Sequence, residues 1–413
     1  MTTRLGLLAF ALVTGLPVAM QGAELRAGVA RVDLQLGAAA HDPLQARILL
    51  LRTANDSVAL VTCDLYRFQS KRVSEEARRT LDIGTVLFAA SGTHSAPGAE
   101  GPPPAWLPGV EEAILGGLKQ AASAMFAARL GAGFGSAELA YNWRMVDEQG
   151  AVRMLWRNPE RKPSGPLWTT VPVWRIETEA GELRALLYSA ACPASIVAPG
   201  TRQLSADYPG HASRRVEAIL GGRPVALFLQ GSSGNLAPFA NESSFEQANQ
   251  VGEQLAQEVV RVSRTITPQP ESNPSLTVHR TSLTFRERWG SQRSVPVEAA
   301  TVVVNRNYAL AAFPGVPFVE YQIALADRSP AGHTLLAAHT QTGNGEWIGV
   351  LPTIRAAAEG GYGAGYATRL EVGAGEALLD AALVIIYRAL GKLDDLPRGN
   401  LVVDTPPEGR AHR

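Results

Sequence analysis

Short apolar runs rich in Val, Ile and Leu are separated by turn residues along most of the chain. Residues 46–53 and 57–64 form two such runs on either side of Ala-Asn-Asp, a pattern that predicts a β-hairpin. A second hairpin is predicted at residues 302–305 and 308–313, on either side of an Arg-Asn pair. The other predicted strands are residues 86–91, 132–139, 171–177, 183–192, 224–230 and 335–340.

Apolar residues at helical spacing occur between these strands. Val110, Ile114 and Leu118 recur on one face of a helix predicted over residues 110–129, which follows Pro108. The other predicted helices are residues 242–266, 319–327 and 374–390, with a further helix after Pro209. Because strands and helices alternate without an internal repeat, the sequence predicts one large layered α/β domain.

A polar stretch at residues 141–168 has no strong periodicity, and we expect it to form a long ordered loop or lid. Four tryptophans, three of them in this stretch, could line a lipid or sugar cleft. Alternatively, they could pack in the core or the lid, because an aromatic ring buries a large area in either place. These are Trp143, Trp156, Trp168 and Trp347.

The two ends of the chain differ from the part between them. Arg4 precedes an apolar run at residues 5–20, and the small residues Gly22 and Ala23 follow. This order is typical of a secretory signal peptide, so we predict export to the periplasm or beyond, with residues 1–23 removed. We expect a single domain over residues 24–393, no further membrane-spanning segment, and a flexible tail at 394–413, where Pro, Gly and charge show no periodicity.

Composition excludes several classes of protein. Apolar residues make up 46% of the chain and charged residues 18%, which is incompatible with intrinsic disorder. The 38 Lys and Arg residues match 38 Asp and Glu residues, so nucleic-acid binding has no electrostatic basis. Two cysteines are too few for a disulfide scaffold or a structural zinc site.

Several turn motifs follow directly after predicted strands, which is where ligands bind in α/β sheets. They are Cys63-Asp64-Leu65, Gly92-Thr93-His94-Ser95-Ala96-Pro97, Cys192-Pro193-Ala194-Ser195, Gly231-Ser232-Ser233-Gly234-Asn235-Leu236-Ala237-Pro238 and Pro314-Gly315-Val316-Pro317-Phe318. Other short motifs are Ala27-Gly28-Val29-Ala30-Arg31-Val32-Asp33, His41-Asp42-Pro43-Leu44, Tyr141-Asn142-Trp143-Arg144, Ser205-Ala206-Asp207-Tyr208-Pro209-Gly210 and Gly360-Gly361-Tyr362. In this order, from about Leu25 to Leu393, they resemble the N-terminal catalytic domain of the neutral/alkaline (non-lysosomal) ceramidase family.

The resemblance implies a layered α/β domain without the C-terminal immunoglobulin-like domain of longer members. The family members are zinc amidases of lipid metabolism, in which a metal-activated water cleaves the N-acyl bond of ceramide. The positions that match the family's zinc ligands are Gly92, Cys192, Val316 and Val350. Gly and Val have no ligating atom, so we expect no metal at this position. Ala237 and Asn235 stand where the family has its catalytic serine and an aspartate.

Polar residues on the substrate side of the motifs are retained. By the resemblance, His94 and Arg144 contact the polar head of a substrate, and Asn142 and Asp207 match the family pattern beside them. Each of these has a structural alternative. His94 could be satisfied by backbone partners, Arg144 could form a bracing ion pair, Asn142 could brace a loop, and Asp207 could cap the helix after Pro209.

Cys192 and Ser233 are the candidate nucleophiles. An imidazolium near Cys192, such as that of His94, would lower the pKa of the thiol and activate it. Alternatively, Cys192 forms a disulfide with Cys63 or is an inert buried residue. Ser233 lies in a Gly-Ser-Ser-Gly turn that is one residue short of a nucleophile elbow, because Asn235 occupies the last glycine position.

Three hypotheses for function follow. The first is a ceramidase-like pseudoenzyme without metal that binds a lipid-like or N-acyl ligand. The second is an active hydrolase of amide or ester bonds that uses His94 with Cys192, or with Ser233 in a triad completed by Asp207. The third is a zinc hydrolase with relocated ligands, for which the candidates are His41, Asp64, His94 and Asp207.

Overall fold

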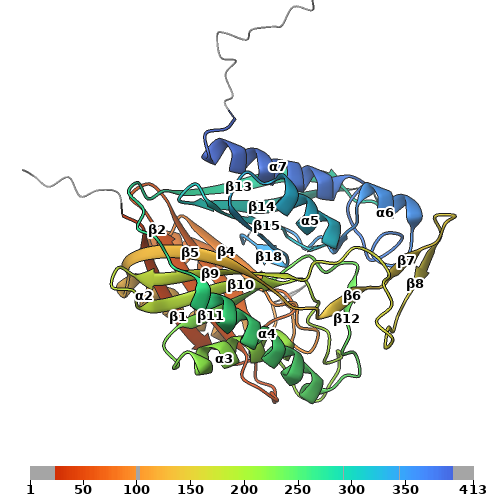
Figure 1. Ribbon diagram of the computed structural model, residues 1–413, viewed down its shortest axis with the longest axis horizontal. Coiled ribbons are helices and arrows are strands. Elements are labelled where there is room, and N and C mark those ends of the chain that lie inside the picture. Colours follow the sequence, from red (N-terminus) through yellow and green to blue (C-terminus); the bar gives the residue numbers. More distant parts are fainter. Residues whose placement is uncertain (1–23, 99–102, 292, 344, 394–413) are drawn as a thin grey trace, which may run out of the picture.

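The computed structural model describes residues 24–98, 103–291, 293–343 and 345–393. The predicted signal peptide and the predicted tail therefore lie outside the described residues. Two stacked sheets form the centre of the molecule, with helices on both outer faces (Figure 1).

The larger sheet has nine strands in the order β11-β10-β9-β5-β1-β2-β3-β4-β18. The predicted first hairpin is confirmed as the antiparallel pair β2–β3, with Ile48 opposite Val61. Pairs β3–β4 and β10–β11 are parallel. Within each pair, the turns that follow the two strands therefore lie at the same edge of the sheet. The strands are β1 (Arg26–Asp33), β2 (Gln45–Arg52), β3 (Ser57–Cys63), β4 (Thr85–Ala90), β5 (Phe126–Ser136), β9 (Thr170–Thr178), β10 (Leu183–Ala190), β11 (Val225–Gln230) and β18 (Thr340–Gln341).

The smaller sheet has four strands in the order β13-β14-β15-β17. These are β13 (Leu276–Arg286), β14 (Ser294–Val304), β15 (Tyr308–Ala312) and β17 (His333–Ala337), and β14–β15 is the predicted second hairpin. Its inner face supplies Val302, Leu310 and Leu335 to a core shared with Leu49, Leu187 and other residues of the large sheet. The two sheets are therefore joined by a continuous apolar layer.

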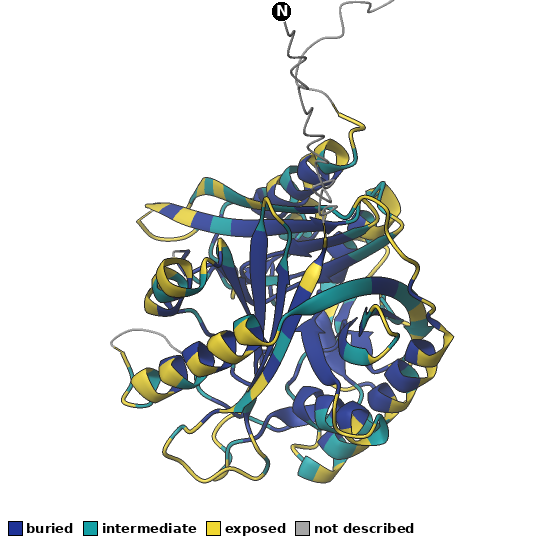
Figure 2. Ribbon diagram, turned by 90° about the vertical axis from the view of Figure 1, so that its left-hand side faces the viewer, coloured by how far each residue is buried: buried dark blue, intermediate teal, exposed yellow. Residues whose placement is uncertain are grey.

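Helices cover the outer faces of both sheets (Figure 2). Helices α1 (Lys71–Leu81) and α2 (Leu107–Ser123) pack on the β1–β4 half of the large sheet. Helices α3 (Asp207–Ile219) and α4 (Phe245–Thr265) pack on the β5–β11 half, where Figure 2 shows their outer sides exposed and their inner sides buried. Helices α5 (Val319–Arg328), α6 (Ile354–Glu359) and α7 (Ala374–Ala389) cover the small sheet. The result confirms the predicted layered α/β fold.

The predicted elements differ from the structure in a few places. The helix predicted to end at residue 129 ends at Ser123, and Phe126 already begins β5. The stretch at residues 141–168 contains short strands, β6 (Ala140–Asn142), β7 (Arg144–Val146) and β8 (Val152–Met154), and β6 pairs with β12 (Leu236–Pro238). A last short pair joins β16 (Val316–Pro317) to β19 (Val350–Leu351). In the described part of the chain, no helix is both long and apolar enough to span a membrane.

Candidate functional site

A pocket of about 250 Å³ lies where the turns after several strands meet. The turn after β4 contributes Gly92 and His94, and the turn after β11 contributes Ser233. The remaining lining residues come from β11 and the turn after it, from the turns after β10 and β17, from β12, β16 and β19, and from loops: Tyr66, Trp143, Pro193, Ala194, Ser195, Gln230, Gly234, Leu236, Ala237, Val316, His339, Trp347, Gly349, Val350, Tyr362 and Ala367. Three of the four positions that match the family's zinc ligands thus lie in one pocket.

The space beside Gly92 is filled by the ring of His339. Gly92 has a φ of +75°, a left-handed conformation that favours glycine. A Cβ atom added to it would lie 2.9 Å from Cε1, 3.0 Å from Nε2 and 3.3 Å from Nδ1 of His339. The histidine ring therefore occupies the volume into which a side chain at position 92 would project. The sequence analysis missed His339, because only the fold brings residues 92 and 339 together.

Backbone hydrogen bonds fix His339 in this place. Its N–H donates to the carbonyl of Gly315 at 2.9 Å, and its carbonyl accepts from Ala90 N–H at 3.1 Å. Its own φ is +53°. Burial and the nearby His94 lower the pKa of His339 to about 3, which a hydrogen bond to the Tyr66 backbone opposes only in part. The ring is therefore neutral at physiological pH.

Val316 and Val350 form an apolar part of the pocket wall. They face each other in the parallel pair β16–β19, and both side chains line the pocket. Their hydrocarbon contacts continue to the turn after β11, because a Cβ added to Gly234 would lie 3.0 Å from Cγ1 of Val350. Ala237 also lines the pocket, so no hydroxyl stands at the position of the family's catalytic serine.

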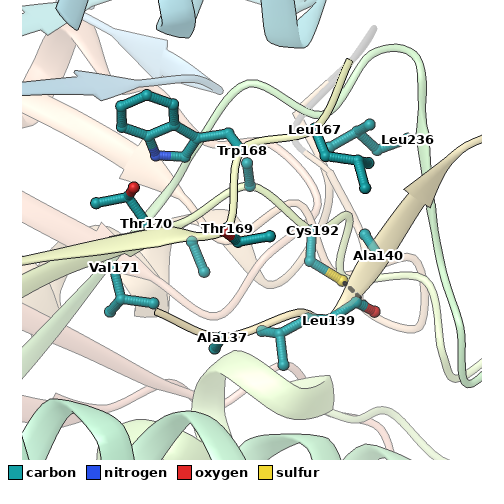
Figure 3. Close-up of a pocket in the computed structure, with 12 residues that line it drawn as sticks. Ala137, Leu139, Ala140, Leu167, Trp168, Thr169, Thr170, Val171, Cys192 and Leu236 are labelled. Carbon is teal, nitrogen blue, oxygen red and sulfur yellow. Dashed lines mark hydrogen bonds between the residues drawn. The ribbon is translucent and has the colours of Figure 1, made fainter. Parts of the chain in front are cut away.

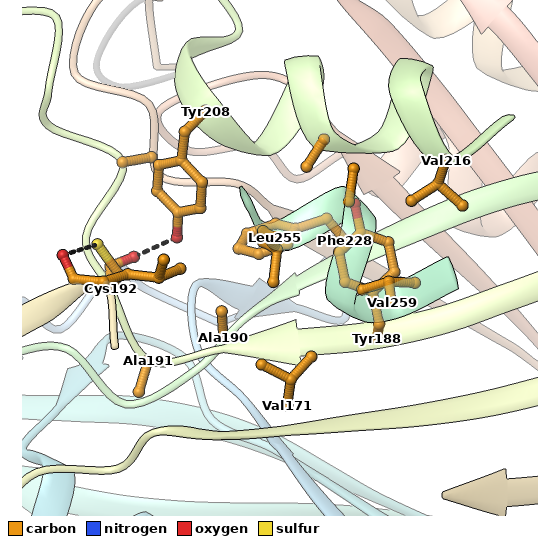
Figure 4. Close-up of a cluster of buried hydrophobic side chains, with 14 of the residues drawn as sticks. Val171, Tyr188, Ala190, Ala191, Cys192, Tyr208, Val216, Phe228, Leu255 and Val259 are labelled. Carbon is orange, nitrogen blue, oxygen red and sulfur yellow. Dashed lines mark hydrogen bonds between the residues drawn. The ribbon is translucent and has the colours of Figure 1, made fainter. Parts of the chain in front are cut away.

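Cys192, at the fourth ligand position, does not line this pocket. Its side chain is fully buried, and Sγ lies 3.8 Å from the carbonyl oxygens of Leu139 and Pro193 (Figure 3). It borders a cavity of about 10 Å³, room for about one water molecule at most. Its carbonyl accepts a hydrogen bond from the hydroxyl of Tyr208, within the apolar core beneath α3 and α4 (Figure 4).

The surroundings of Cys192 disfavour a thiolate. Burial, with the neighbouring Asp207 carboxylate, raises the pKa of the thiol well above its ordinary value. Cys63 is also a free, buried thiol, and it packs in the separate core beneath α1 and α2. The disulfide alternative is therefore wrong, and the placement of Cys192 matches the inert buried alternative.

The residues at the zinc positions do not fit a zinc ion. Gly92, Val316 and Val350 offer no ligating atom, and the thiol of Cys192 is directed away from the pocket. The candidates for relocated ligands do not converge: His41 stacks on Phe245, and Asp64 accepts hydrogen bonds from Gln45 N–H and from the buried Arg47. Within the residues that the structure describes, no group of three or more His, Cys, Asp or Glu side chains could hold a metal ion.

His94 and Ser233 do come together in the pocket wall. The backbone N–H of His94 donates to the carbonyl of Ala194, and its ring meets the Tyr66 ring edge-on at 5.3 Å. Solvent reaches the His94 ring from the pocket, yet desolvation by the surrounding atoms lowers its pKa. The hydroxyl of Ser233 is buried and has no hydrogen-bond partner among the described residues, so it is not bonded to this imidazole.

Asn142 and Arg144 line a second, adjoining pocket of about 280 Å³ and do not line the one that holds His94. Arg144 is buried, pairs with Glu359 at 3.2 Å and donates to the carbonyls of Gly360 and Tyr362. Asn142 accepts from Arg144 N–H at 3.0 Å. Arg144 therefore positions the loop that carries Tyr362, a lining residue of the first pocket, whereas Asn142 braces its own loop through Arg144 N–H and the carbonyl of Pro166.

Asp207 braces a loop and does not cap the following helix as the sequence suggested, because α3 begins at Asp207 itself and its N-cap position is Ala206, which has no capping side chain. Its carboxylate accepts from Val197 N–H at 2.8 Å and from Tyr208 N–H at 2.6 Å. Burial raises its pKa to about 7. Because both oxygens are used by backbone groups, Asp207 does not complete a triad with His94 and Ser233.

Aromatic rings form much of the remaining wall. Trp347 lies 5.1 Å from His339 and 6.4 Å from Tyr66, measured between ring centroids. On the other side, Trp143 meets Tyr362 at 4.8 Å. Trp168 borders the small cavity beside Cys192 instead (Figure 3).

Comparisons with known proteins place the fold. A scan against models of protein families gives no match, and a search of curated protein sequences gives none. Among solved structures, the chain is similar to the neutral ceramidase from Pseudomonas aeruginosa, with a TM-score of 0.70 and 14% identity over 90% of this chain and 75% of that one. It is similar to a ceramidase complexed with C2, with a TM-score of 0.71 and 13% identity over 90% of this chain and 76% of that one. The fold that the sequence motifs predicted is confirmed: this chain folds as a divergent, ceramidase-like α/β domain.

Proposed function

We propose that this chain is an exported, ceramidase-like pseudoenzyme that binds a lipid-like or N-acyl ligand without the zinc centre implied by the resemblance. The observation that carries the proposal is the packing of the His339 ring into the space beside Gly92. A histidine restored at position 92 would collide with that ring. The replacement of a histidine by Gly92 is thus accompanied by a second residue, His339, that fills the space of the missing side chain.

The character of the pocket supports binding. Of the lining residues that the structure describes, none is Asp, Glu, Lys or Arg, and six are Tyr, Trp or Val, namely Tyr66, Trp143, Val316, Trp347, Val350 and Tyr362. Pockets of this kind hold ligands by apolar contact and use a few polar groups for orientation. Neutral ceramidases are named for an N-acyl lipid, so an N-acyl or lipid-like ligand is the natural first choice.

A metal-free hydrolase is the second candidate, because His94 and Ser233 line the same pocket. A serine nucleophile needs a base within hydrogen-bond reach and a group that orients that base. The hydroxyl of Ser233 has no hydrogen bond to a base. The carboxylate of Asp207 is bonded to backbone N–H groups and does not orient His94. Binding without turnover therefore agrees better with the geometry.

The test combines metal analysis, ligand binding and turnover on the purified full chain. We expect less than 0.1 equivalent of zinc per chain by elemental analysis, as an order-of-magnitude threshold for a site without ligands. We expect saturable binding of a short-chain N-acylsphingosine by calorimetry, no release of the fatty acid, and no change on adding chelator. Trp347→Ala should weaken binding by about tenfold or more, the loss typical of a buried aromatic anchor. Phe134→Ala is the control, because Phe134 is an exposed aromatic residue that does not line the pocket.

Three results would decide against the proposal. One equivalent of tightly bound zinc with chelator-sensitive hydrolysis supports a relocated metal site. Hydrolysis that survives chelator and is lost in His94→Ala supports the metal-free hydrolase. Failure to bind any N-acyl lipid excludes this ligand class. Export is tested separately, by the N-terminal sequence of protein recovered from the periplasm or medium, which should begin within a few residues of Glu24.

A further inference from the structure

Four buried polar atoms that belong to lining residues of the pocket have no hydrogen-bond partner in the part of the chain that the structure describes. They are Oε1 of Gln230, Oγ of Ser233, Nδ1 of His339 and Nε1 of Trp143. Gln230, Ser233 and His339 are 1%, 3% and 6% exposed. Buried polar atoms in proteins nearly always have a partner, so a set of four in one pocket wall indicates that a ligand or ordered water completes them.

The neighbours of Gln230 fix which way its amide points. Its Nε2 lies near three carbonyl oxygens, those of Ala190 at 3.5 Å, Cys192 at 2.9 Å and Gly231 at 3.2 Å. Turning the amide over would direct Oε1 at three acceptors. The NH₂ group therefore faces these carbonyls, and Oε1 is left as an acceptor without a donor.

His339 presents a second polar atom without a partner. Its ring is neutral, and Nδ1 has no hydrogen-bond partner among the described residues. In a neutral imidazole this nitrogen accepts or donates one hydrogen bond, according to the tautomer. Ser233 can donate or accept, and Nε1–H of Trp143, also unpartnered and in the lining, is a donor.

These groups define a recognition surface without charge. With an amide oxygen that accepts, an imidazole nitrogen and a hydroxyl that can each donate or accept, and an indole N–H that donates, the lining matches a ligand that carries several hydroxyl groups. The absence of any Asp, Glu, Lys or Arg among the described lining residues disfavours a phosphate, carboxylate or ammonium group, which would lose its hydration without gaining a counter-charge. The volume of about 250 Å³ is slightly below the roughly 300 Å³ at which pockets for drug-sized ligands begin, so the pocket has room for a headgroup, and the alkyl chains of a lipid would extend outside it.

We propose that the part of the ligand held in this pocket is an uncharged, polyhydroxylated ring, that is, a neutral sugar. Its hydroxyl groups would bond Gln230, Ser233 and His339, and its apolar face would lie on the ring of Trp347 or Trp143. The proposal rests on the proposed function only in taking this pocket as the binding site. A free sugar and the headgroup of a glycolipid share this chemistry, and alkyl chains of the latter would lie outside the pocket.

The experiment compares four probes by calorimetry and by quenching of tryptophan fluorescence: methyl glucoside, octyl glucoside below its micelle concentration, glucose 6-phosphate and a short-chain N-acylsphingosine. We expect both glucosides to bind in competition with each other and the phosphate to bind at least tenfold more weakly. Equal affinities for the two glucosides identify a free sugar as the ligand. A clear preference for octyl glucoside identifies the headgroup of an amphiphile.

Ser233→Ala tests the contact without disturbing the fold, because its hydroxyl bonds nothing among the described residues. We expect it to weaken glucoside binding by about three- to tenfold, the loss of one hydrogen bond, with an unchanged melting temperature. The matched control is Ser189→Ala, which removes another fully buried, unpartnered hydroxyl that does not line the pocket.

The outcomes separate this proposal from the function on which it rests. If the N-acylsphingosine binds and neither glucoside binds or competes, the sugar proposal is overturned and the proposed function stands. If the glucosides bind and the N-acylsphingosine does not, the sugar proposal stands and the N-acyl ligand is excluded. Glucoside binding that Ser233→Ala leaves unchanged overturns the assignment to this pocket.

Discussion

Replacing Gly92 by alanine tests the packing on which the proposed function depends. The substitution adds one methyl group at a residue whose φ is +75°. The new Cβ would lie 2.9–3.3 Å from three atoms of the His339 imidazole. Contacts this short require the ring to move, and the backbone hydrogen bonds of His339 to Gly315 and Ala90 oppose that movement.

Two costs combine in the Gly92→Ala variant. A left-handed backbone conformation costs an L-residue about 1–2 kcal/mol, and overpacking a rigid interior costs about 1–3 kcal/mol. Their sum is about 2–5 kcal/mol of unfolding free energy. Since 1 kcal/mol lowers the melting temperature by roughly 2–4 °C in a domain of 150–250 residues and by less in a longer one, a fall of several degrees is expected.

The chain offers a control that separates the two costs. Gly150 has a φ of +80°, and a Cβ added there would meet no atom within 4 Å. Gly150→Ala should therefore show only the conformational cost. Scanning calorimetry of both variants, and of each substitution combined with His339→Ala, gives a double-mutant cycle.

The cycle has a clear expected result. Removing the imidazole opens the space beside Gly92, so Gly92→Ala should cost about 1–3 kcal/mol less in the His339→Ala background than in the natural sequence. Gly150→Ala should cost the same in both backgrounds. The reasoning is refuted if the Gly92→Ala penalty does not change when His339 is removed, because the ring would then not occupy that space.

Three further predictions follow from the site. Cys192, whose pKa is raised by burial, should resist alkylation by iodoacetamide at pH 8 in the folded protein and react fully in denaturant; rapid labelling of Cys192 in the native state, located by mass spectrometry, contradicts its placement. Asp207 has a folded-state pKa raised to about 7 against an ordinary value near 4, so the folded state binds the extra proton and stability should decline as pH rises from about 4 to 7. Melting temperatures from pH 5 to 8 should show a shallower decline in Asp207→Asn, and parallel curves contradict the shift. Arg144→Met removes a buried partner of Glu359 and should lower the free energy of unfolding by about 3–5 kcal/mol. Arg161→Met, at an exposed ion pair, should lower it by about 1 kcal/mol or less. Equal melting temperatures for the two variants contradict a bracing role for Arg144.

Local patterns predicted the framework of the fold. The β2–β3 and β14–β15 hairpins follow from apolar runs that flank turn residues, and α4 and α7 match the predicted helices to within a few residues. The end of α2 was misplaced because no Gly or Pro separates the helix from β5, and Ala, Met and Phe follow Ser123 directly. Strand β13 was not predicted, since its polar and charged residues alternate on a half-exposed face.

The candidate site was predicted only in part, because its packing depends on contacts distant in sequence. Motif order located Gly92, His94, Val316 and Val350, which do line one pocket. His339 had no motif of its own, and its role follows only from the ring contact with Gly92. Arg144 matched the same set of motifs, but the fold turns its guanidinium toward Glu359 in the adjoining pocket.

The residues that replace the expected ligands are those that a pocket without a cation requires. A buried carboxylate or imidazole without its metal would be an uncompensated polar group, which costs several kcal/mol. Val316 and Val350 avoid that cost because their side chains are hydrocarbon. Gly92 avoids it because it has no side chain, and the ring of His339 fills the space beside it. The same cost should act against Oε1 of Gln230, Nδ1 of His339 and the hydroxyl of Ser233, yet these atoms remain without partners in the described structure. A pocket with no charged group among its described lining residues that keeps these polar atoms fits a ligand or ordered water that completes their hydrogen bonds. These atoms are therefore a better guide to what the protein binds than the positions that match the family's zinc ligands.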